Sequence, residues 1–194
     1  MSKGRLEAFS DGVIAIIITI MVLELKVPEQ SELAALGPLV PALLSYVLSF
    51  IFVGIYWNNH HHLFQAVRHV DGHILWANLH LLFWLSLIPF STRWMGESNF
   101  AAWPVAIYGA VLLMAALAWW ILAALLLARE GADSPLAIAV GQVVKERLSL
   151  ALYAIAIAVS FWNRWIACGI YVLVAAMWLI PDRRIEKTLV GREH

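Results

Sequence analysis

The chain has 194 residues, of which 62% are apolar and 13% are charged, whereas soluble domains contain roughly 45–50% apolar and about 25% charged residues. Uncharged stretches of 35, 21 and 31 residues, at positions 33–67, 72–92 and 98–128, exceed the roughly 20 residues that a membrane-crossing helix needs, which excludes an ordinary soluble globule and indicates a polytopic membrane protein. Thirteen basic residues balance thirteen acidic ones, so no net charge favours nucleic acid as a partner, and the single cysteine excludes an intrachain disulfide.

Six helices are predicted in chain order, at about 5–25, 39–66, 73–94, 100–128, 135–161 and 165–181. Their limits follow turn-forming residue pairs such as Gly37-Pro38, Asp71-Gly72 and Ser134-Pro135. The expected fold class is therefore all-α, with residues 1–194 forming one transmembrane domain of six helices.

The distribution of basic residues gives the expected orientation in the membrane. If the N-terminus is cytoplasmic, ten Lys and Arg residues lie on the cytoplasmic side, and only Lys26, Arg93 and Arg164 lie on the other. We therefore expect a multi-pass protein of the cell membrane, surrounded by the lipid bilayer, with both termini in the cytoplasm.

The first helix carries a carboxylate at membrane depth. Only 12 uncharged residues separate Asp11 from Glu24, which is about 18 Å of helix, whereas the hydrocarbon core is about 30 Å thick. Intramembrane carboxylates usually face a bundle interior or a water-filled path, which makes Asp11 a candidate functional residue. The alternative is that Asp11 extends to the lipid headgroups and has no further role.

The same helix has a second, mostly apolar side. At 100° per residue, Gly12, Ile16, Thr19, Ile20 and Leu23 form one stripe, and Asp11 points nearly the opposite way. Helical periodicity alone does not decide whether this stripe faces lipid, packs against protein or lines a pore.

Polar residues at the end of the second helix and the start of the third should lie near the start of the first, on the cytoplasmic side. Among them Trp57, His60 and His61 share a helix face with Phe64, and Asn78 reaches the depth of Asp11. We predict a polar network in which these side chains satisfy donors that lipid cannot satisfy. Its predicted members are Asp11, Arg5, Ser10, Trp57, His60 or His61, and Asn78.

Two alternative interpretations apply to the histidines. A transition-metal or haem site is conceivable because imidazole is a common ligand, but no acidic or cysteine ligand set accompanies these residues, so no metal site is predicted. His62, His69 and His73 lie nearest the loop, where histidines can sit at the headgroup interface without further function.

No sequence motif of an enzyme is present. G-x-S-x-G, P-loop, G-x-G-x-x-G and H-E-x-x-H patterns are missing, and Cys168 has no evident base beside it. The T-V-G-Y-G filter of ordinary potassium channels is missing as well, so a conduit through this protein would have to use side chains.

The segment Arg5-Leu6-Glu7-Ala8-Phe9-Ser10-Asp11 resembles the R-x-x-x-F-S-D signature of the transmembrane protein 175 family of potassium channels. The resemblance continues to Pro28, reappears in Trp57-x-x-His60-His61-x-x-Phe64 and Trp76-x-Asn78, and extends to Pro89-Phe90. It implies a six-helix subunit with one repeat, as in bacterial members, assembled as a homotetramer around the first helix.

The resemblance also implies roles for individual residues. Ile16 would form the pore constriction, with Ile20 and Leu23 further outward, and Thr19 would contribute to potassium selectivity. The network residues, joined by Phe9, would hold the pore helix in place.

The function expected is a potassium-selective leak-type channel that needs no cofactor and has potassium ions as its permeant partner. The alternatives are a proton- or cation-coupled secondary transporter that uses Asp11 and the membrane histidines, and a scaffold without transport.

Overall fold

The computed structural model describes residues 3–67, 70–130 and 143–179, and every regular element within them is helical. The elements are α1 (Lys3–Leu23), the 3-10 helix η1 (Leu33–Leu39), α2 (Val40–Gln65), α3 (Gly72–Ser86), α4 (Ile88–Glu97), α5 (Ala102–Glu130), α7 (Val143–Ser160) and α8 (Arg164–Leu179). The all-α prediction is therefore confirmed.

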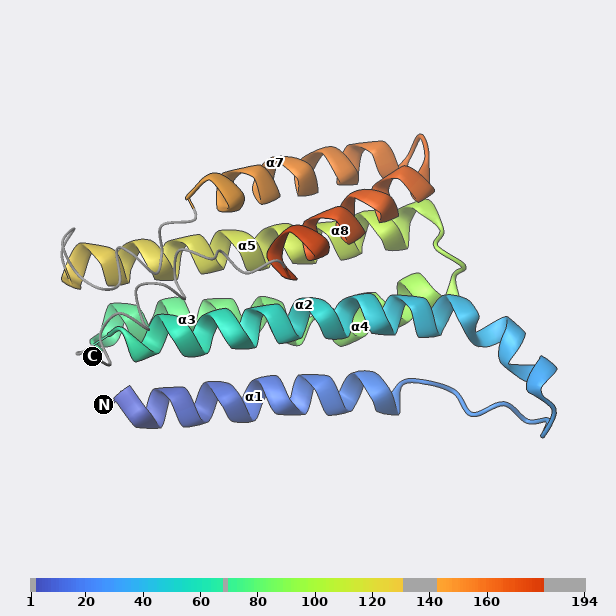
Figure 1. Cartoon of the computed structure of the whole chain (residues 1–194), viewed down its shortest axis with the longest axis horizontal. Helices are drawn as coiled ribbons and strands as arrows, with labels where there is room; N and C mark the ends of the chain where they lie inside the picture. Colours follow the sequence, from blue (N-terminus) through green and yellow to red (C-terminus); the bar gives the residue numbers. More distant parts are fainter. Residues whose placement is uncertain (1–2, 68–69, 131–142, 180–194) are drawn as a thin grey trace, which may run out of the picture.

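The helices run roughly along the longest axis of the molecule, and α1 lies at one edge of the bundle (Figure 1). α1 contacts α2, α3 and α4, whereas α5 contacts α3, α4, α7 and α8. The start of α1, the end of α2 and the start of α3 lie at the same end of the molecule (Figure 1). This arrangement brings the polar segments of the three helices together, as the predicted topology requires.

Within the described residues, four segments are long and apolar enough to cross a membrane: Lys3–Leu23, Leu33–Gln65, Gly72–Glu97 and Ala102–Glu130. The third of them consists of α3 and α4 together, and the shorter α8 is also apolar. When α3 and α4 are counted as one crossing, the described helices correspond to the six that the sequence predicts.

The predicted continuous helix over 73–94 is wrong in one respect, because the structure breaks it at Leu87 into α3 and α4. Pro89 lies in the first turn of α4, where its missing N–H costs no hydrogen bond; inside a continuous helix it would remove one and clash with the preceding turn. The predicted helix start at 135 and the predicted end at 181 fall outside the described residues.

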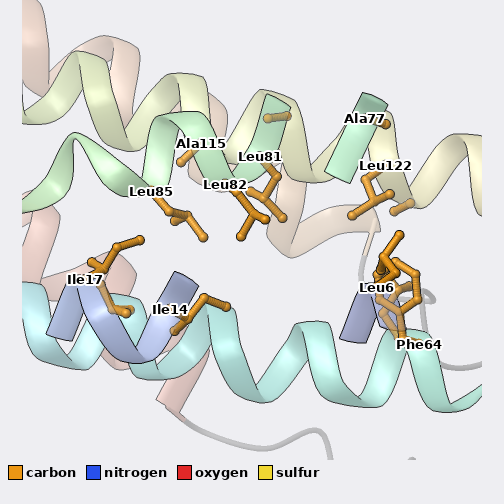
Figure 2. Close-up of a cluster of buried hydrophobic side chains, with 14 of the residues drawn as sticks. Leu6, Ile14, Ile17, Phe64, Ala77, Leu81, Leu82, Leu85, Ala115 and Leu122 are labelled. Atoms are coloured by element: carbon orange, nitrogen blue, oxygen red, sulfur yellow. The ribbon is translucent and has the colours of Figure 1, made fainter. Parts of the chain in front are cut away.

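Two apolar clusters hold the helices together. The first joins α1 to α2, α3 and α5, with Leu6, Ile14 and Ile17 of α1 pointing toward Phe64 of α2 and Leu85 of α3 (Figure 2). The second lies between α2, α4, α5, α7 and α8. Lipid is as apolar as these side chains, so close packing of the apolar face, and not its removal from water, attaches α1 to the bundle.

Gly109 allows α5 and α8 to approach closely. The hydroxyl of Tyr171 donates a hydrogen bond to the Val105 carbonyl at 3.0 Å, and a Cβ atom at position 109 would lie 2.0 Å from that hydroxyl. We expect Gly109→Ala to lower the free energy of unfolding by about 1–3 kcal/mol because Tyr171 must move. Thermal unfolding in detergent measures this effect. Gly169→Ala, where no atom lies within 4 Å, is the matched control, and equal melting of the two variants would contradict the steric explanation.

Asp71 ties the start of α3 to the end of α5. Its carboxylate accepts a hydrogen bond from the Ile74 backbone N–H at 3.0 Å and forms an ion pair with Arg129. The hydrogen bond from Ile74, together with the guanidinium of Arg129, lowers the pKa of Asp71 below its usual 3.8. Because the folded-state pKa lies below the unfolded-state pKa, the stabilisation is complete above pH 3.8 and is lost as the pH falls through the folded-state pKa.

Asp71→Asn should therefore melt at a lower temperature than the parent at pH 7, although asparagine can still cap α3. The difference should shrink toward zero as the pH falls below the folded-state pKa of Asp71, where the parent also loses the charge. Melting temperatures in detergent between about pH 7 and pH 3 test this expectation. A difference that stays constant over this range would show that the charge is not responsible.

Candidate functional site

The side of α1 that packs into the subunit is a single face. Its buried residues recur every three or four positions, namely Leu6, Ser10, Ile14, Ile17 and Met21. Their neighbours come from α2, α3 and α4. The opposite side of α1 is therefore left uncovered by the described residues of the chain.

The four residues predicted to line a pore lie together on this uncovered side. Ile16 is 59% exposed, Ile20 is 41% exposed and Leu23 is 81% exposed, and Thr19 is exposed among them. We call these four residues the exposed stripe. Apolar side chains are ordinary on the surface of a membrane helix, so exposure alone leaves the stripe available to another subunit, to lipid or to a permeation path.

The hydroxyl of Thr19 has a defined orientation. Its Oγ1 donates a hydrogen bond to the Ile16 carbonyl of the same helix at 2.8 Å. A hydroxyl has one donor and two acceptor lone pairs, so this bond uses the donor and leaves acceptor capacity on the oxygen. The Thr19 oxygen can therefore act as a ligand for a cation on the exposed side of α1.

A buried polar network joins α1 to α2 and α3. The Nδ2 atom of Asn78 donates to the Ser10 hydroxyl at 2.9 Å, and Ser10 donates to the Leu6 carbonyl at 2.9 Å. The Oδ1 atom of Asn78 lies 2.8 Å from His60 Nε2, and a carbonyl oxygen can only accept, so Nε2 carries the proton. Ser10, His60 and Asn78 are each at most 2% exposed, so these bonds replace water completely.

A second, exposed polar contact lies beside the buried network. The indole Nε1 of Trp57 donates to Asp11 Oδ1 at 3.0 Å, and the Trp57 ring stacks on the imidazole of His61 at 6.1 Å between ring centroids. His61 also forms a hydrogen bond of 2.8 Å with Gln65. The sequence left open whether His60 or His61 is the partner within the network, and here His60 contacts Asn78 whereas His61 contacts Trp57.

Arg5 and Phe9 do not join either group. Both are exposed, with Phe9 at 51%, and no ion pair between described residues links Arg5 to Asp11. The predicted meeting of Arg5 with Asp11 is therefore not found within the subunit. The physical reason is the helical angle, because at 100° per residue Arg5 and Phe9 fall on the same side as Ile16 and away from Ser10.

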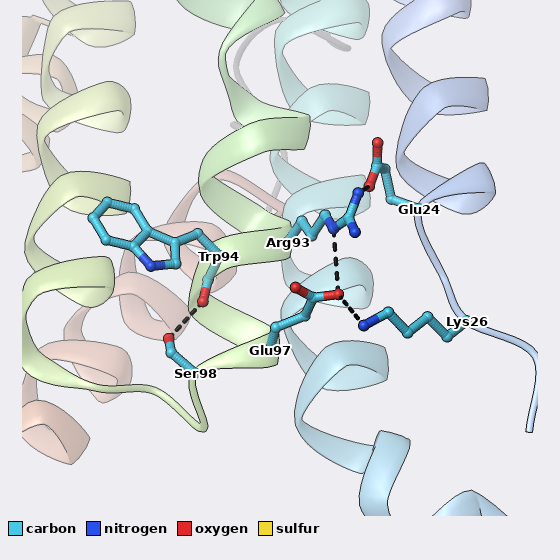
Figure 3. A network of polar contacts seen from close by, with 6 residues as sticks. All are labelled: Glu24, Lys26, Arg93, Trp94, Glu97 and Ser98. Atoms are coloured by element: carbon cyan, nitrogen blue, oxygen red, sulfur yellow. Dashed lines mark hydrogen bonds and ion pairs between the residues drawn. The ribbon is translucent and has the colours of Figure 1, made fainter.

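A charged cluster that was not predicted from the sequence lies at the other end of α1. Arg93 of α4 pairs with Glu24 and lies 3.3 Å from Glu97, and Lys26 Nζ lies 2.8 Å from the same Glu97 oxygen (Figure 3). The cluster borders a cavity of about 320 Å³ between the end of α1, the start of α2 and α4. The basic residues could have indicated this cluster. Lys26 and Arg93 are two of the three Lys and Arg residues that the predicted orientation places on the non-cytoplasmic side.

The remaining histidines do not form a metal centre in the part of the chain that the structure describes. No group of three or more His, Cys, Asp or Glu side chains there could hold a metal ion. His62 and His73 are exposed near the loop between α2 and α3, and His69 lies outside the described residues.

Comparisons with known proteins connect this arrangement to a family. Residues 5–89 match the family model described as endosomal/lysosomal potassium channel TMEM175. A potassium channel of Chryseobacterium sp. (strain P1-3) is 61% identical over 189 residues, which cover 97% of this chain and 98% of the relative. A potassium channel of Chamaesiphon minutus is 33% identical over 89% of this chain and 91% of the relative.

A solved structure of a family member has a similar fold. The crystal structure of a lysosomal potassium-selective channel TMEM175 homolog from Chamaesiphon minutus has a TM-score of 0.79 and 30% sequence identity. The match covers 91% of this chain and 96% of that chain, so it includes the helices beyond residue 89 that the family model does not reach. The resemblance noted in the sequence is confirmed, and the chain belongs to the TMEM175 family.

Proposed function

We propose that this chain is the subunit of a potassium channel. The observation that carries the proposal is the 61% identity to a bacterial potassium channel over nearly the full length of both chains. The matching relatives and the structural neighbour are named as ion channels, so the chain belongs to a channel family and is not an enzyme. No cofactor takes part in the proposed function, and potassium is the permeant ion.

The permeation path is formed by the exposed stripe of several subunits. One chain offers a single uncovered α1, and one helix cannot enclose a path, so copies must surround a common axis. We take the number as four, because the family resemblance implies a homotetramer around the first helix. The uncovered position of Arg5 and Phe9 fits this assembly, since both side chains would then lie near the neighbouring α1 helices.

The stripe supplies both a barrier and an ion ligand. Four Ile16 side chains, with Ile20 and Leu23 further along α1, can close an aqueous path by excluding water. Four Thr19 oxygens with free lone pairs can replace part of the hydration shell of a potassium ion while binding it weakly enough to release it. This combination predicts a leak-type channel with modest selectivity for potassium over sodium.

Two sets of contacts would hold α1 in position. The buried network of Ser10, Asn78 and His60 fixes one end, and the charged cluster around Arg93 fixes the other. The two sets lie away from the exposed stripe, so they would set the position of the pore helix without contacting the ion. Asp11 and Trp57 add an exposed contact between α1 and α2.

We place the channel in the cell membrane with both termini in the cytoplasm. Ten Lys and Arg residues lie on the cytoplasmic side in this orientation and three on the other. The end of the molecule that holds the buried network would then face the cytoplasm, and the charged cluster would lie at the outer surface.

Reconstituted protein tests the function. Purified protein in liposomes should pass potassium down its gradient without ATP or a counter-ion, with a reversal potential that follows the potassium gradient. A reversal potential that moves with pH at a fixed stoichiometry would instead indicate a coupled transporter that uses Asp11 and the histidines. Absence of flux from correctly assembled protein would indicate a scaffold.

A further inference from the structure

A second cavity lies on the side of the subunit away from α1. Its volume is about 30 Å³, and its walls come from α2, α5, α7 and α8. A space of roughly 10–15 Å³ on this measure holds one water molecule, so this cavity has room for about two groups of that size. The proposed permeation path does not use any of its residues.

Glu146 supplies the one carboxyl group among the described residues that line this cavity. The residue is 8% exposed, and its carboxylate accepts one hydrogen bond, from Trp119 Nε1 at 3.3 Å. None of the ten described residues that line the cavity is Lys, Arg or His. A carboxyl group removed from water either keeps its proton or, when ionised, requires a cation or several hydrogen bonds, and Glu146 has only the bond from Trp119 within the described chain.

Three more polar side chains around Glu146 lack partners. Tyr153 is 2% exposed and Tyr56 and Asn59 are partly buried, and none of the three has a hydrogen-bond partner among the described residues. The great majority of buried polar groups in proteins are hydrogen-bonded, so a cluster of unpaired groups indicates a missing partner. In contrast, Ser149 is hydrogen-bonded both ways, because it accepts from Trp178 at 2.9 Å and donates to the Lys145 carbonyl at 2.8 Å.

We propose that this cavity binds a primary ammonium group. An ammonium would supply the positive charge that an ionised Glu146 lacks among the described residues of the cavity. The three N–H donors of an ammonium match the acceptors that lack partners, namely the Glu146 carboxylate, the Tyr56 and Tyr153 hydroxyls and the Asn59 amide oxygen. The volume admits the ammonium and the first carbon attached to it.

The aromatic character of the walls favours an ammonium over a bare alkali ion. Five of the ten lining residues are aromatic, and Tyr56 and Trp119 meet edge to face at 6.3 Å. Aromatic faces attract organic cations and pack against their carbon atoms. A bare potassium ion instead needs oxygen ligands all around it in place of its hydration shell.

The ammonium group could belong to a free small amine or to the headgroup of an ethanolamine lipid. Both sources present the same chemistry to Glu146, and Glu146 lies in the first turn of α7, near the end of a helix that we place in the membrane. The trimethylated headgroup of a choline lipid is too bulky for a cavity of about 30 Å³. The two sources are therefore distinguishable by the lipid supplied.

The direct test titrates methylammonium chloride into the full chain in detergent, at constant ionic strength, and follows the melting temperature. We expect saturable stabilisation that potassium chloride does not reproduce. Glu146→Gln should weaken binding by about tenfold or more, because it removes the charge, and Tyr153→Phe should weaken it by about two- to tenfold. Glu29→Gln, the same chemical change at an exposed loop position, should bind like the parent.

The second arm compares nanodiscs that contain phosphatidylethanolamine with nanodiscs of phosphatidylcholine alone. Stabilisation by phosphatidylethanolamine that Tyr153→Phe reduces would identify a lipid source, and stabilisation by methylammonium alone would identify a free amine. The proposal is overturned if methylammonium gives no saturable effect, if potassium gives the same effect, or if Tyr153→Phe and a folded Glu146→Gln protein both bind like the parent. These readouts concern binding and not conduction, so they do not depend on the channel proposal.

Discussion

Replacing Ile16 by Ala should increase potassium flux through reconstituted protein by about tenfold or more. The substitution removes apolar bulk from every subunit at the proposed constriction, where Ile16 is 59% exposed on the isolated chain, so the path should widen and admit water more easily. A barrier lowered by only about 1.4 kcal/mol is enough for a tenfold change in rate. Liposome flux at matched protein amounts measures the effect, and discrimination against sodium should fall in part.

Thr19 provides the matched comparison one turn away. Thr19→Val keeps nearly the same shape but deletes the hydroxyl, so the preference for potassium should fall without a comparable rise in flux. Thr19→Ser keeps the hydroxyl and should retain more of the preference. If Ile16→Ala and Thr19→Val both behave like the parent, α1 is a packing or lipid-facing helix and the pore assignment is wrong.

Replacing Asn78 by Leu should destabilise the subunit by about 2–4 kcal/mol. Leucine has a similar size but removes the acceptor for His60 and the donor to Ser10, and both of these groups are buried with no water to replace them. We also expect loss of assembly, because the network connects α1 to α2 and α3. Thermal unfolding and size-exclusion chromatography in detergent measure the two effects.

Asn58→Leu is the control for this experiment, since Asn58 is exposed on α2 and the chemical change is identical. Asp11→Asn should have a smaller effect than Asn78→Leu, because the asparagine Oδ1 can still accept the hydrogen bond from Trp57. Parent-like melting and assembly of Asn78→Leu would show that the buried network does not hold α1.

The sequence was sufficient to predict the features that depend on a single helix. Uncharged stretches longer than a membrane crossing predicted the helices, and the angle of 100° per residue placed Ile16 and Thr19 on one stripe. Helix length and topology also predicted that Ser10 and Asn78 lie in one network, but not that they pair with each other. The break before Pro89 could have been predicted from the properties of proline alone.

The features that the sequence did not predict depend on how helices rotate against each other. Arg5 was assigned to the network because it lies at the cytoplasmic start of the first helix, although its helical angle places it with the exposed stripe. The partners of Arg93 and the burial of Glu146 depend on packing of α4 against α1 and of α7 against α5, which hydrophobic periodicity does not specify.

The most direct test of the pore assignment is chemical modification of a cysteine placed at Thr19, in protein whose single cysteine has been removed by Cys168→Ser. A charged, water-soluble thiol reagent should reach this cysteine from the permeation path and reduce potassium flux. The same reagent should leave flux unchanged in Leu173→Cys, which is exposed on the apolar helix α8. Potassium flux through Thr19→Cys that the reagent does not change would contradict the claim that the exposed side of α1 lines the channel.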